Sequence, residues 1–342
     1  MKKALIKLSI LWDKIRDFLI SVLITILIII VILCLVHNVI KIIQISNKYE
    51  GKYQNFVEAD NGDIINVQEY GNGEKTIVIL SGYGIQVPSI FYKNLAMELS
   101  NTYRVVILEY PGYGFTKNTE NERDNENLAN DIKQALEKAE ISGPYILMPH
   151  SISNLYAMKF IEMYPELVES VISIDGVYPQ EVANEDGKEN IKNTCINTKI
   201  SSILECTGFA RILSYAKPDL YGLDTMKEDS NISDEDVKLY RKMIATNYLT
   251  KNMREEINDL ESNMNEMVDF KYPDNLPVLE VLATETVDSY DEKYEKNKLS
   301  KMANAVISNN EIQKVVQIQG SHLLNMTNPE DLTSETIKFI DN

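Results

Sequence analysis

The chain has 342 residues, of which 44% are hydrophobic and 25% charged. This ordinary globular composition excludes a disordered, collagen-like or disulfide-scaffold protein. The net charge of −17 argues against a nucleic-acid-binding protein, because such proteins need a basic surface to displace counterions from phosphates. Residues 1–50 carry seven Lys or Arg and three Asp or Glu, which leaves −21 for the rest of the chain. A basic end joined to an acidic body indicates that the two parts face different surroundings.

An uncharged apolar run occupies Phe18–Val36 and contains only two polar side chains. At 1.5 Å per residue, a helix of this length spans the roughly 30 Å hydrocarbon core of a bilayer. A buried core helix seldom runs this far without a polar face. A cleaved signal peptide would have a shorter apolar region and a small-residue cleavage site, which His37–Lys41 does not offer. We therefore predict an uncleaved transmembrane helix within residues 1–45.

Basic residues are more numerous before this apolar run than after it. Only Lys41 and Lys48 follow it closely. The positive-inside rule then places the N-terminus in the cytoplasm and the body outside the cell membrane, as a single-pass protein. The basic residues that precede the run are Lys2, Lys3, Lys7, Lys14 and Arg16.

Two of the three cysteines, Cys195 and Cys206, lie in the predicted extracytoplasmic body. A disulfide between them can form in an oxidising compartment, although two free thiols fit the spacing equally well. No cluster of Cys and His has the spacing of metal ligands. We therefore expect neither a metal nor an organic cofactor.

After a polar linker at residues 46–54, strand and helix patterns alternate along the chain. Alternation of this kind predicts an α/β fold with a mostly parallel, doubly wound sheet and right-handed crossovers. The expected strands are continuous apolar runs or alternating segments. They occupy residues 55–59, 64–70, 76–80, 105–108, 145–148, 171–174, 277–283 and 314–318, and the expected helices occupy residues 89–99, 122–139, 153–164, 292–307 and 329–340.

The alternation stops between residues 176 and 272, a stretch that has helical patterns throughout. Ser233–Asp236 resembles a helix start, with an N-cap hydroxyl followed by acids that complement the helix dipole. Ligands of open α/β sheets bind at the carboxyl ends of the strands, so a helical insertion after the sixth strand is most simply a cap over a pocket. This divides the body into a core of residues 55–175 and 273–342 and a cap of residues 176–272.

The segment Met148–Ser153 lies between a predicted strand and a predicted helix, which is the setting of a nucleophile elbow. In such a tight turn the positions two before and two after Ser151 are usually Gly, but here they are Pro149 and Ser153. Pro149 is the larger departure, because its ring restricts both itself and the preceding residue. The alternative is an ordinary strand-to-helix turn in which Ser151 caps the helix.

The chain has three histidines: His37 beside the apolar run, His150 next to Ser151, and His322. His322 follows the last predicted strand in the segment Gly320–His322, and it alone can approach Ser151 from another strand. Neutral imidazole takes a proton from a hydroxyl and returns it to a leaving group. His322 is therefore the candidate general base.

Two further segments follow predicted strands and contain closely spaced glycines. In Ser81–Gly84 the glycines let the backbone approach a reacting carbonyl, so that the amides of Tyr83 and Ile152 can form an oxyanion hole. The second segment, Glu109–Gly114, is expected to form a tight loop at the same sheet edge, without a catalytic role.

These four segments, in this order, resemble the motifs of the α/β-hydrolase superfamily, in the branch with a cap after the sixth strand. Ser81–Gly84 stands where that family has His-Gly-x-Gly, and Glu109–Gly114 where it has Asp-x-x-Gly-x-Gly. Residues 149–153 stand for Gly-His-Ser-x-Gly, and Gly320–His322 for Gly-x-His. The similarity covers about residues 53–342.

The resemblance implies an α/β-hydrolase fold with Ser151 as nucleophile, His322 as base, and the amides of Tyr83 and Ile152 as oxyanion donors. Ser81 replaces the usual His, which removes a supporting hydrogen bond rather than a catalytic group.

The family usually supplies the triad acid in the loop after the seventh strand. Here that loop is residues 283–288, in which Thr286 occupies the expected position between Glu285 and Asp288. The alternative is Asp175 at the end of the sixth strand, in a segment similar to Gly-Leu-Asp-x-x-x-Pro of the pancreatic-lipase family. We favour Asp175, then Asp288, then Glu285. The acid would fix the tautomer of His322 and stabilise the imidazolium.

The resemblance predicts a membrane-anchored serine hydrolase that cleaves an ester or thioester through an acyl-enzyme on Ser151. Lipid-like esters fit an anchored enzyme, and a small peptide or amide is a less favoured substrate. The expected partners are a small acyl substrate and the lipid bilayer. Two alternatives stay open: a catalytically degenerate hydrolase-fold binding protein, and an acyltransferase. The residues predict neither the identity of the substrate nor the oligomeric state.

Overall fold

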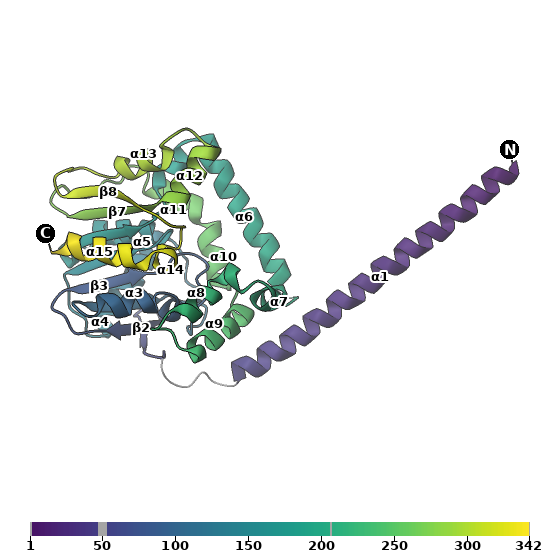
Figure 1. Cartoon of the computed structure of the whole chain (residues 1–342), viewed down its shortest axis with the longest axis horizontal. Helices are drawn as coiled ribbons and strands as arrows, with labels where there is room; N and C mark the ends of the chain where they lie inside the picture. Colours follow the sequence, from purple (N-terminus) through teal and green to yellow (C-terminus); the bar gives the residue numbers. More distant parts are fainter. Residues whose placement is uncertain (1, 47–52, 206, 342) are drawn as a thin grey trace.

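The computed structural model describes residues 2–46, 53–205 and 207–341, and most of the predicted linker lies outside these ranges. The long helix α1 (Lys2–Ser46) extends away from a body that contains the remaining elements (Figure 1). Its segment Ile10–Ile43 is long and apolar enough to cross a membrane, and its most apolar stretch is not buried against the body. The predicted apolar N-terminal helix is therefore confirmed.

The body is built on a sheet of eight strands in the order β1-β2-β4-β3-β5-β6-β7-β8. β1 and β2 are antiparallel to each other, and β2 is antiparallel to β4, whereas all other neighbours are parallel. The strands are β1 (Phe56–Glu58), β2 (Ile64–Tyr70), β3 (Thr76–Leu80), β4 (Arg104–Glu109), β5 (Tyr145–Pro149), β6 (Val168–Ile174), β7 (Val278–Ala283) and β8 (Gln313–Ile318). The predicted mostly parallel sheet is confirmed, with the antiparallel pairs at one edge.

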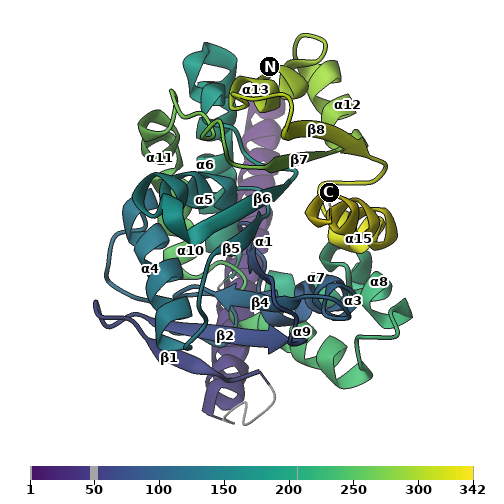
Figure 2. The same ribbon diagram turned by 90° about the vertical axis from the view of Figure 1, so that its left-hand side faces the viewer.

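Helices cover both faces of the sheet, and a separate hydrophobic core fills each side. Figure 2 shows α4 and α5 on one face and α3 and α15 on the other. The central strands β3 and β5 are buried along their whole length, as expected of strands covered on both faces. The covering helices are α2 (Pro88–Phe91), α3 (Lys93–Leu99), α4 (Asn125–Lys138), α5 (Ser153–Met163), α14 (Leu324–Thr327) and α15 (Pro329–Ile340).

Between β6 and β7 every element that the structure describes is helical, which confirms a helical insertion after the sixth strand. The predicted start of α9 is confirmed in detail: the Ser233 hydroxyl accepts from the Asp236 amide (3.2 Å), and the Asp236 carboxylate accepts from the Ser233 amide (3.1 Å). The α-helices of the insertion are α6 (Glu185–Glu205), α7 (Phe209–Ala216), α8 (Leu223–Glu228), α9 (Asp234–Thr246), α10 (Lys251–Asn258) and α11 (Leu260–Glu266).

Two expected elements differ from the structure. The helix expected at residues 292–307 is instead two helices, α12 (Thr284–Lys293) and α13 (Lys298–Ala305). Asn297 adopts a left-handed conformation with φ of 61°, which ends one helical path and starts another. Because α12 begins directly after β7, the segment 283–288 is mostly helical rather than the expected loop. Similarly, the helix expected at residues 89–99 is divided into α2 and α3 at Tyr92.

Candidate active site

Ser151 lies in the sharp turn between β5 and α5, with a backbone φ of 58°. This left-handed conformation is strained for a residue with a side chain. The turn is held in place because the Ser151 amide donates to the Ile174 carbonyl (3.1 Å) and the Val177 amide donates to the Ser151 carbonyl (3.0 Å). The N-cap of α5 is Ile152, without a side-chain cap. The interpretation of Ser151 as a helix cap is therefore wrong.

The two departures from the elbow motif have a structural explanation. Pro149 is the last residue of β5, and the ladder bond to the Leu80 carbonyl comes from the next residue, His150 (3.0 Å). The Ser153 hydroxyl accepts from the His150 amide (2.9 Å) and donates to the Leu80 carbonyl (2.8 Å). Ser153 therefore ties the elbow to the end of β3 through contacts that Gly could not make.

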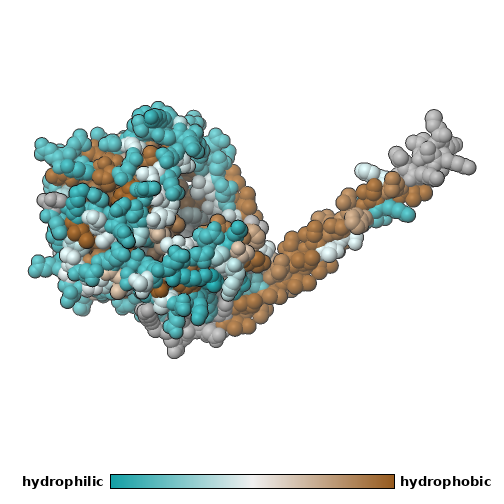
Figure 3. Space-filling view, in the orientation of Figure 1, coloured by the Kyte–Doolittle hydropathy of each residue, from teal (hydrophilic) through white to brown (hydrophobic). Residues whose placement is uncertain are grey.

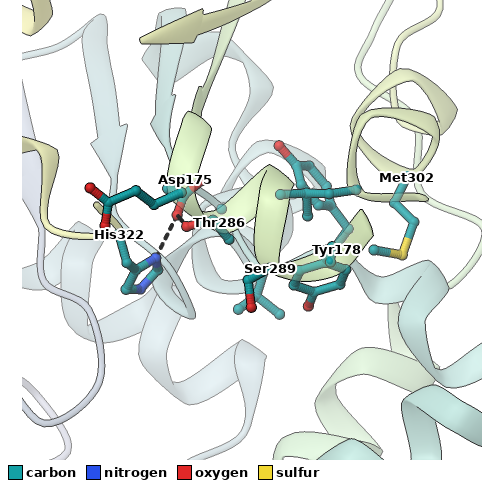
Figure 4. A pocket seen from close by; sticks show the side chains of 11 residues that line it. Asp175, Tyr178, Thr286, Ser289, Met302 and His322 are labelled. Carbon is teal, nitrogen blue, oxygen red and sulfur yellow. Dashed lines mark hydrogen bonds and ion pairs between the residues drawn. The ribbon is translucent and has the colours of Figure 1, made fainter. Parts of the chain in front are cut away.

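Asp175 and His322 are in direct contact at the carboxyl ends of β6 and β8 (Figure 4). The Asp175 Oδ2 atom lies 2.6 Å from His322 Nδ1, and it also accepts from the Thr286 hydroxyl at 2.6 Å. The other carboxylate oxygen, Oδ1, accepts from the Ala283 amide (2.8 Å). Asp175 is buried, whereas the His322 side chain is 43% exposed. A buried carboxylate with three donors is fixed in position, so it also fixes the imidazole.

The other two candidate acids, Glu285 and Asp288, lie on α12 and are exposed. Neither has a hydrogen bond or ion pair with His322 within the described residues. The structure therefore brings Asp175, and not these two, to the imidazole. Thr286, which occupies the position expected for the acid, contacts the same carboxylate.

His150 is completely buried between Tyr92 and the backbone of His322. Its Nδ1 lies 2.7 Å from the Tyr92 hydroxyl, and its Nε2 lies 2.9 Å from the His322 carbonyl oxygen. Burial, and then the neighbouring His322, lower the pKa of His150 to about 3. The neutral ring therefore donates from Nε2 to the carbonyl and accepts from Tyr92 at Nδ1. No pattern in the sequence indicated Tyr92, because the contact joins residues 58 positions apart.

His150 and His322 lie side by side, with ring centroids 4.8 Å apart, so His322 is next to the elbow. Within the described part of the chain, no hydrogen bond joins the Ser151 hydroxyl to the His322 ring. Ser151 follows β5 and His322 follows β8, two strands of the same parallel set, so both residues lie at the same edge of the sheet.

The loop Ser81–Gly84 packs directly against the elbow. The Gly82 amide donates to the Tyr92 hydroxyl (3.2 Å), and a Cβ at Gly82 would lie 2.7 Å from His150 Nδ1 and 3.2 Å from Ser151 Cβ. Only glycine permits this approach. The next residue, Tyr83, reaches the insertion through its hydroxyl, 3.2 Å from Thr198 of α6. The amides of Tyr83 and Ile152 have no acceptor among the described residues.

The loop after β4 is organised by the buried carboxylate of Glu109. Glu109 accepts from the Ser89 hydroxyl (2.6 Å), the Asn66 side-chain amide (2.8 Å) and the Phe115 backbone amide (3.1 Å), and burial raises its pKa. A Cβ at Gly114 would lie 2.0 Å from the same carboxylate. These contacts are consistent with the structural role expected of this loop.

A cavity of about 390 Å³ opens beside Asp175 and His322. Its volume lies within the range of small-molecule sites. Figure 4 shows Tyr178, Ser289 and Met302 on the side away from His322. Four of the side chains that line the cavity, Tyr178, Tyr290, Leu299 and Met302, make its wall largely apolar.

Among the residues that the structure describes, no group of three or more His, Cys, Asp or Glu side chains has the arrangement of a metal site. Cys195 is a free thiol and donates to the Ile257 carbonyl (3.2 Å). Its suggested disulfide partner, Cys206, lies outside the described residues.

No protein-family profile matches the chain. It is 25% identical over 281 residues to the uncharacterized protein YbdG of Bacillus subtilis (strain 168), an alignment that covers 82% of this chain and 83% of the relative. It is also 29% identical over 111 residues to the 2-(acetamidomethylene)succinate hydrolase of Mesorhizobium japonicum, which covers 32% of this chain and 38% of that enzyme.

Among solved structures, an epoxide hydrolase from Vigna radiata matches with a TM-score of 0.63 at 18% identity, over 86% of this chain and 99% of the other. A thermophilic esterase from Thermogutta terrifontis matches with a TM-score of 0.57 at 15% identity, over 84% and 98% of the two chains. At these identities the likeness concerns the fold, and it agrees with the strand order and the helical insertion. The chain is an α/β-hydrolase fold protein.

Proposed function

We propose that this protein is a membrane-anchored serine hydrolase with Ser151 as nucleophile, His322 as general base and Asp175 as the orienting acid. The observation that carries the proposal is the contact of 2.6 Å between the buried Asp175 carboxylate and His322 Nδ1, next to a serine held in a strained turn. This contact leaves Nε2 of His322 to accept a proton. Similarity to a curated hydrolase supports the same reaction class.

The reaction follows from these positions. The Ser151 oxygen attacks the carbonyl carbon of an ester or thioester, while Nε2 of His322 takes the hydroxyl proton. The amides of Tyr83 and Ile152 stabilise the oxyanion. His322 then protonates the leaving alcohol or thiol, which departs from the acyl-enzyme. Water attacks the acyl-enzyme, with His322 again as base, and the carboxylic acid and the free Ser151 hydroxyl are released.

We further propose that residues 176–272 act as a cap over this site. Support comes from contacts between the insertion and the loops that follow the central strands. Tyr83 contacts Thr198 of α6, and the Asn247 side chain donates to the Gly114 carbonyl (3.1 Å). The cavity of about 390 Å³ would hold one group of the ester, which favours small or medium-sized acyl substrates.

Anchoring by α1, with the body outside the membrane, completes the proposal. The C-terminal part of α1 contacts the insertion, because Lys41 forms an ion pair of 3.2 Å with Glu205. A helix that is removed as a signal peptide would not keep such a contact. Basic residues concentrated before the span support a cytoplasmic N-terminus.

A fluorophosphonate probe tests the nucleophile, because it reacts covalently with an activated serine. We expect labelling of the full chain in detergent and none of Ser151→Ala. Ser153→Ala is the matched control, since its hydroxyl also lies in the elbow but contacts only the backbone. The direct bond from the His150 amide to the Leu80 carbonyl still joins the elbow to β3, so this variant should keep the label. Absence of labelling in folded wild-type protein would instead favour the catalytically degenerate binding protein.

Kinetics of three variants test the acid. We expect Asp175→Asn to lower kcat on an activated ester by about 10⁴-fold, as loss of a triad acid does. Asp288→Asn and Glu285→Gln should each lose less than about tenfold, because neither carboxylate contacts the imidazole. If all three variants keep kcat within tenfold, the proposed triad is wrong. Products formed with and without an added alcohol then separate a hydrolase from an acyltransferase.

Protease added to intact cells tests the topology. Cleavage beyond about residue 46, with the N-terminal segment protected, is expected of an extracytoplasmic body. Complete protection of the body while lysed cells are digested would contradict the proposed orientation. An N-terminal tag that is still attached to the mature protein would distinguish an anchor from a cleaved signal peptide.

A further inference from the structure

An exposed apolar surface lies on the insertion, on the margin of the body that faces α1 (Figure 3). Each of its six side chains exposes between 43% and 70% of its surface. We call this surface the α6–α7 apolar face. It consists of Ile196 and Ile200 on α6, Phe209, Ile212 and Tyr215 on α7, and Leu220 in the following turn. Monomeric soluble proteins rarely leave so many large apolar side chains exposed together, so such a surface indicates a partner.

The α6–α7 apolar face lies next to the C-terminal part of α1. His37 of α1 is buried, and its Nδ1 lies 2.7 Å from where a Cβ on Gly208 would be. Gly208 precedes α7 in a left-handed conformation with φ of 74°. Glycine is therefore required there both by the backbone and by the close approach of α1. The ion pair between Lys41 and Glu205 fixes the same junction.

The length of α1 sets the level of this junction relative to a bilayer. Trp12 is 70% exposed and precedes the apolar run, where tryptophan commonly marks a membrane interface. The 29 residue-to-residue steps from Trp12 to Lys41 rise by about 44 Å, which matches the thickness of a bilayer with its headgroups. Lys41 therefore lies at the opposite interface. Because Lys41 contacts Glu205, the start of α7 lies at that interface too.

The charges near the face have both signs, so they favour no partner of a single charge. Lys199, Lys217 and Asp219 are exposed beside the apolar side chains, and Arg241 lies 4.9 Å from the centre of the Tyr215 ring. Long basic side chains can extend from an interface into water while their stems stay in apolar surroundings. Tyr215 is 70% exposed, and tyrosine, like tryptophan, is enriched at membrane interfaces. The body as a whole is strongly acidic, so attraction to anionic lipid is not expected and the apolar side chains must supply the binding.

From these observations we propose that the α6–α7 apolar face is immersed in the extracytoplasmic interface of the bilayer that α1 spans, so that the insertion lies on this bilayer beside its own anchor. The inference rests on the anchoring proposed above. It adds that the helices next to the predicted site contact lipid directly. An enzyme positioned in this way takes amphiphilic acyl substrates from the bilayer surface rather than from bulk water. The interaction is apolar, so high salt should not weaken it.

Tryptophan fluorescence of the full chain in phosphatidylcholine vesicles tests this immersion. The chain has a single tryptophan, so Trp12→Phe gives a background without tryptophan signal. Into that background we place Phe209→Trp or Tyr215→Trp on the face. Phe18→Trp in the span serves as the positive control. Met97→Trp is the matched negative control, because Met97 is an exposed apolar residue on α3, outside the face.

Vesicles made with brominated phosphatidylcholine then quench only tryptophans in contact with acyl chains. We expect Phe209→Trp and Tyr215→Trp to lose fluorescence nearly as strongly as Phe18→Trp, with a shift of the emission maximum to shorter wavelength, while Met97→Trp is unaffected. The proposal is overturned if Phe209→Trp and Tyr215→Trp both lose no more fluorescence than Met97→Trp while Phe18→Trp is quenched. A second copy of the chain covering the face would give that same result. If Phe18→Trp is not quenched, the anchor itself is wrong.

Discussion

The buried histidine His150 gives a prediction about acid stability. A histidine that stays neutral when folded but is protonated when unfolded makes the unfolded state bind more protons, so stability rises with pH across that interval. Burial lowers the pKa of His150 to about 3, whereas an unfolded histidine titrates near about 6.5. The contribution of His150 is therefore complete above about pH 6.5 and is lost progressively as the pH falls towards 3.

The magnitude follows from the two pKa values. At about pH 5, protonation of the unfolded state lowers the free energy of unfolding by about 2 kcal/mol, since one pKa unit corresponds to about 1.4 kcal/mol. We expect wild-type protein to lose this amount between about pH 7.5 and pH 5, in addition to the losses that all variants share. His150→Gln removes the titrating group and should not show this additional loss.

Urea denaturation of the full chain in detergent, followed by near-ultraviolet circular dichroism of the tyrosines, measures this difference at the two pH values. Using tyrosine signals from the body avoids α1, which stays helical in detergent. His322→Gln is the matched control, because His150 contacts the backbone carbonyl of His322, which this substitution keeps, so the loss that comes from His150 should remain. Equal losses in wild type and His150→Gln would refute the reasoning, as would disappearance of the loss in His322→Gln alone.

Three further predictions concern contacts around the site and the insertion. In the background of Asp175→Asn, Thr286→Asp should raise kcat at least about tenfold. The reason is that the Thr286 hydroxyl lies 2.6 Å from the Asp175 Oδ2 atom, close to where the new carboxylate would be. An unchanged kcat in a folded double variant would show that this position cannot orient the imidazole. Gly82→Ala should lower both kcat and the thermal midpoint, since the added methyl would lie 2.7 Å from a buried ring nitrogen; unchanged activity would exclude the tight approach. Arg123→Met should lower the free energy of unfolding, measured by urea denaturation, by about 3–5 kcal/mol, because Arg123 is buried facing three carboxylates. Glu256→Gln should lower it by less, because two carboxylates still balance the guanidinium.

The sequence predicts correctly those strands and helices whose pattern is contained in one short segment of the chain. The strands at residues 64–70 and 76–80 and the last helix at residues 329–340 match β2, β3 and α15, because each is a self-contained apolar run or amphipathic segment. The prediction of one helix at residues 292–307 was wrong, since the spacing of apolar residues does not reveal the left-handed turn at Asn297. The start of α9 succeeded because the capping box of Ser233 is entirely local.

The proposed site is predictable to a different degree for each residue. Ser151 and His322 follow from motif order, and the strained turn at Ser151 is what an elbow requires. Their roles stay predictions until the labelling experiment is done. Tyr92 could not be found, because its hydrogen bond to His150 depends on how the junction between α2 and α3 packs against the end of β5. Ser153 looked like a departure from the motif, and only its contacts with β3 explain it.

The acid was ambiguous in the sequence for a reason that the sheet makes clear. β6 and β7 are parallel neighbours, so residues just past their carboxyl ends lie next to each other. The Ala283 amide at the end of β7 donates to Asp175 just past β6, and Thr286 donates to the same carboxylate. A carboxylate carried on either strand can therefore face an imidazole that follows β8. The chain order serine, acid, histidine is the same in both cases, so linear sequence cannot separate them, whereas the contact of 2.6 Å between Asp175 and His322 does.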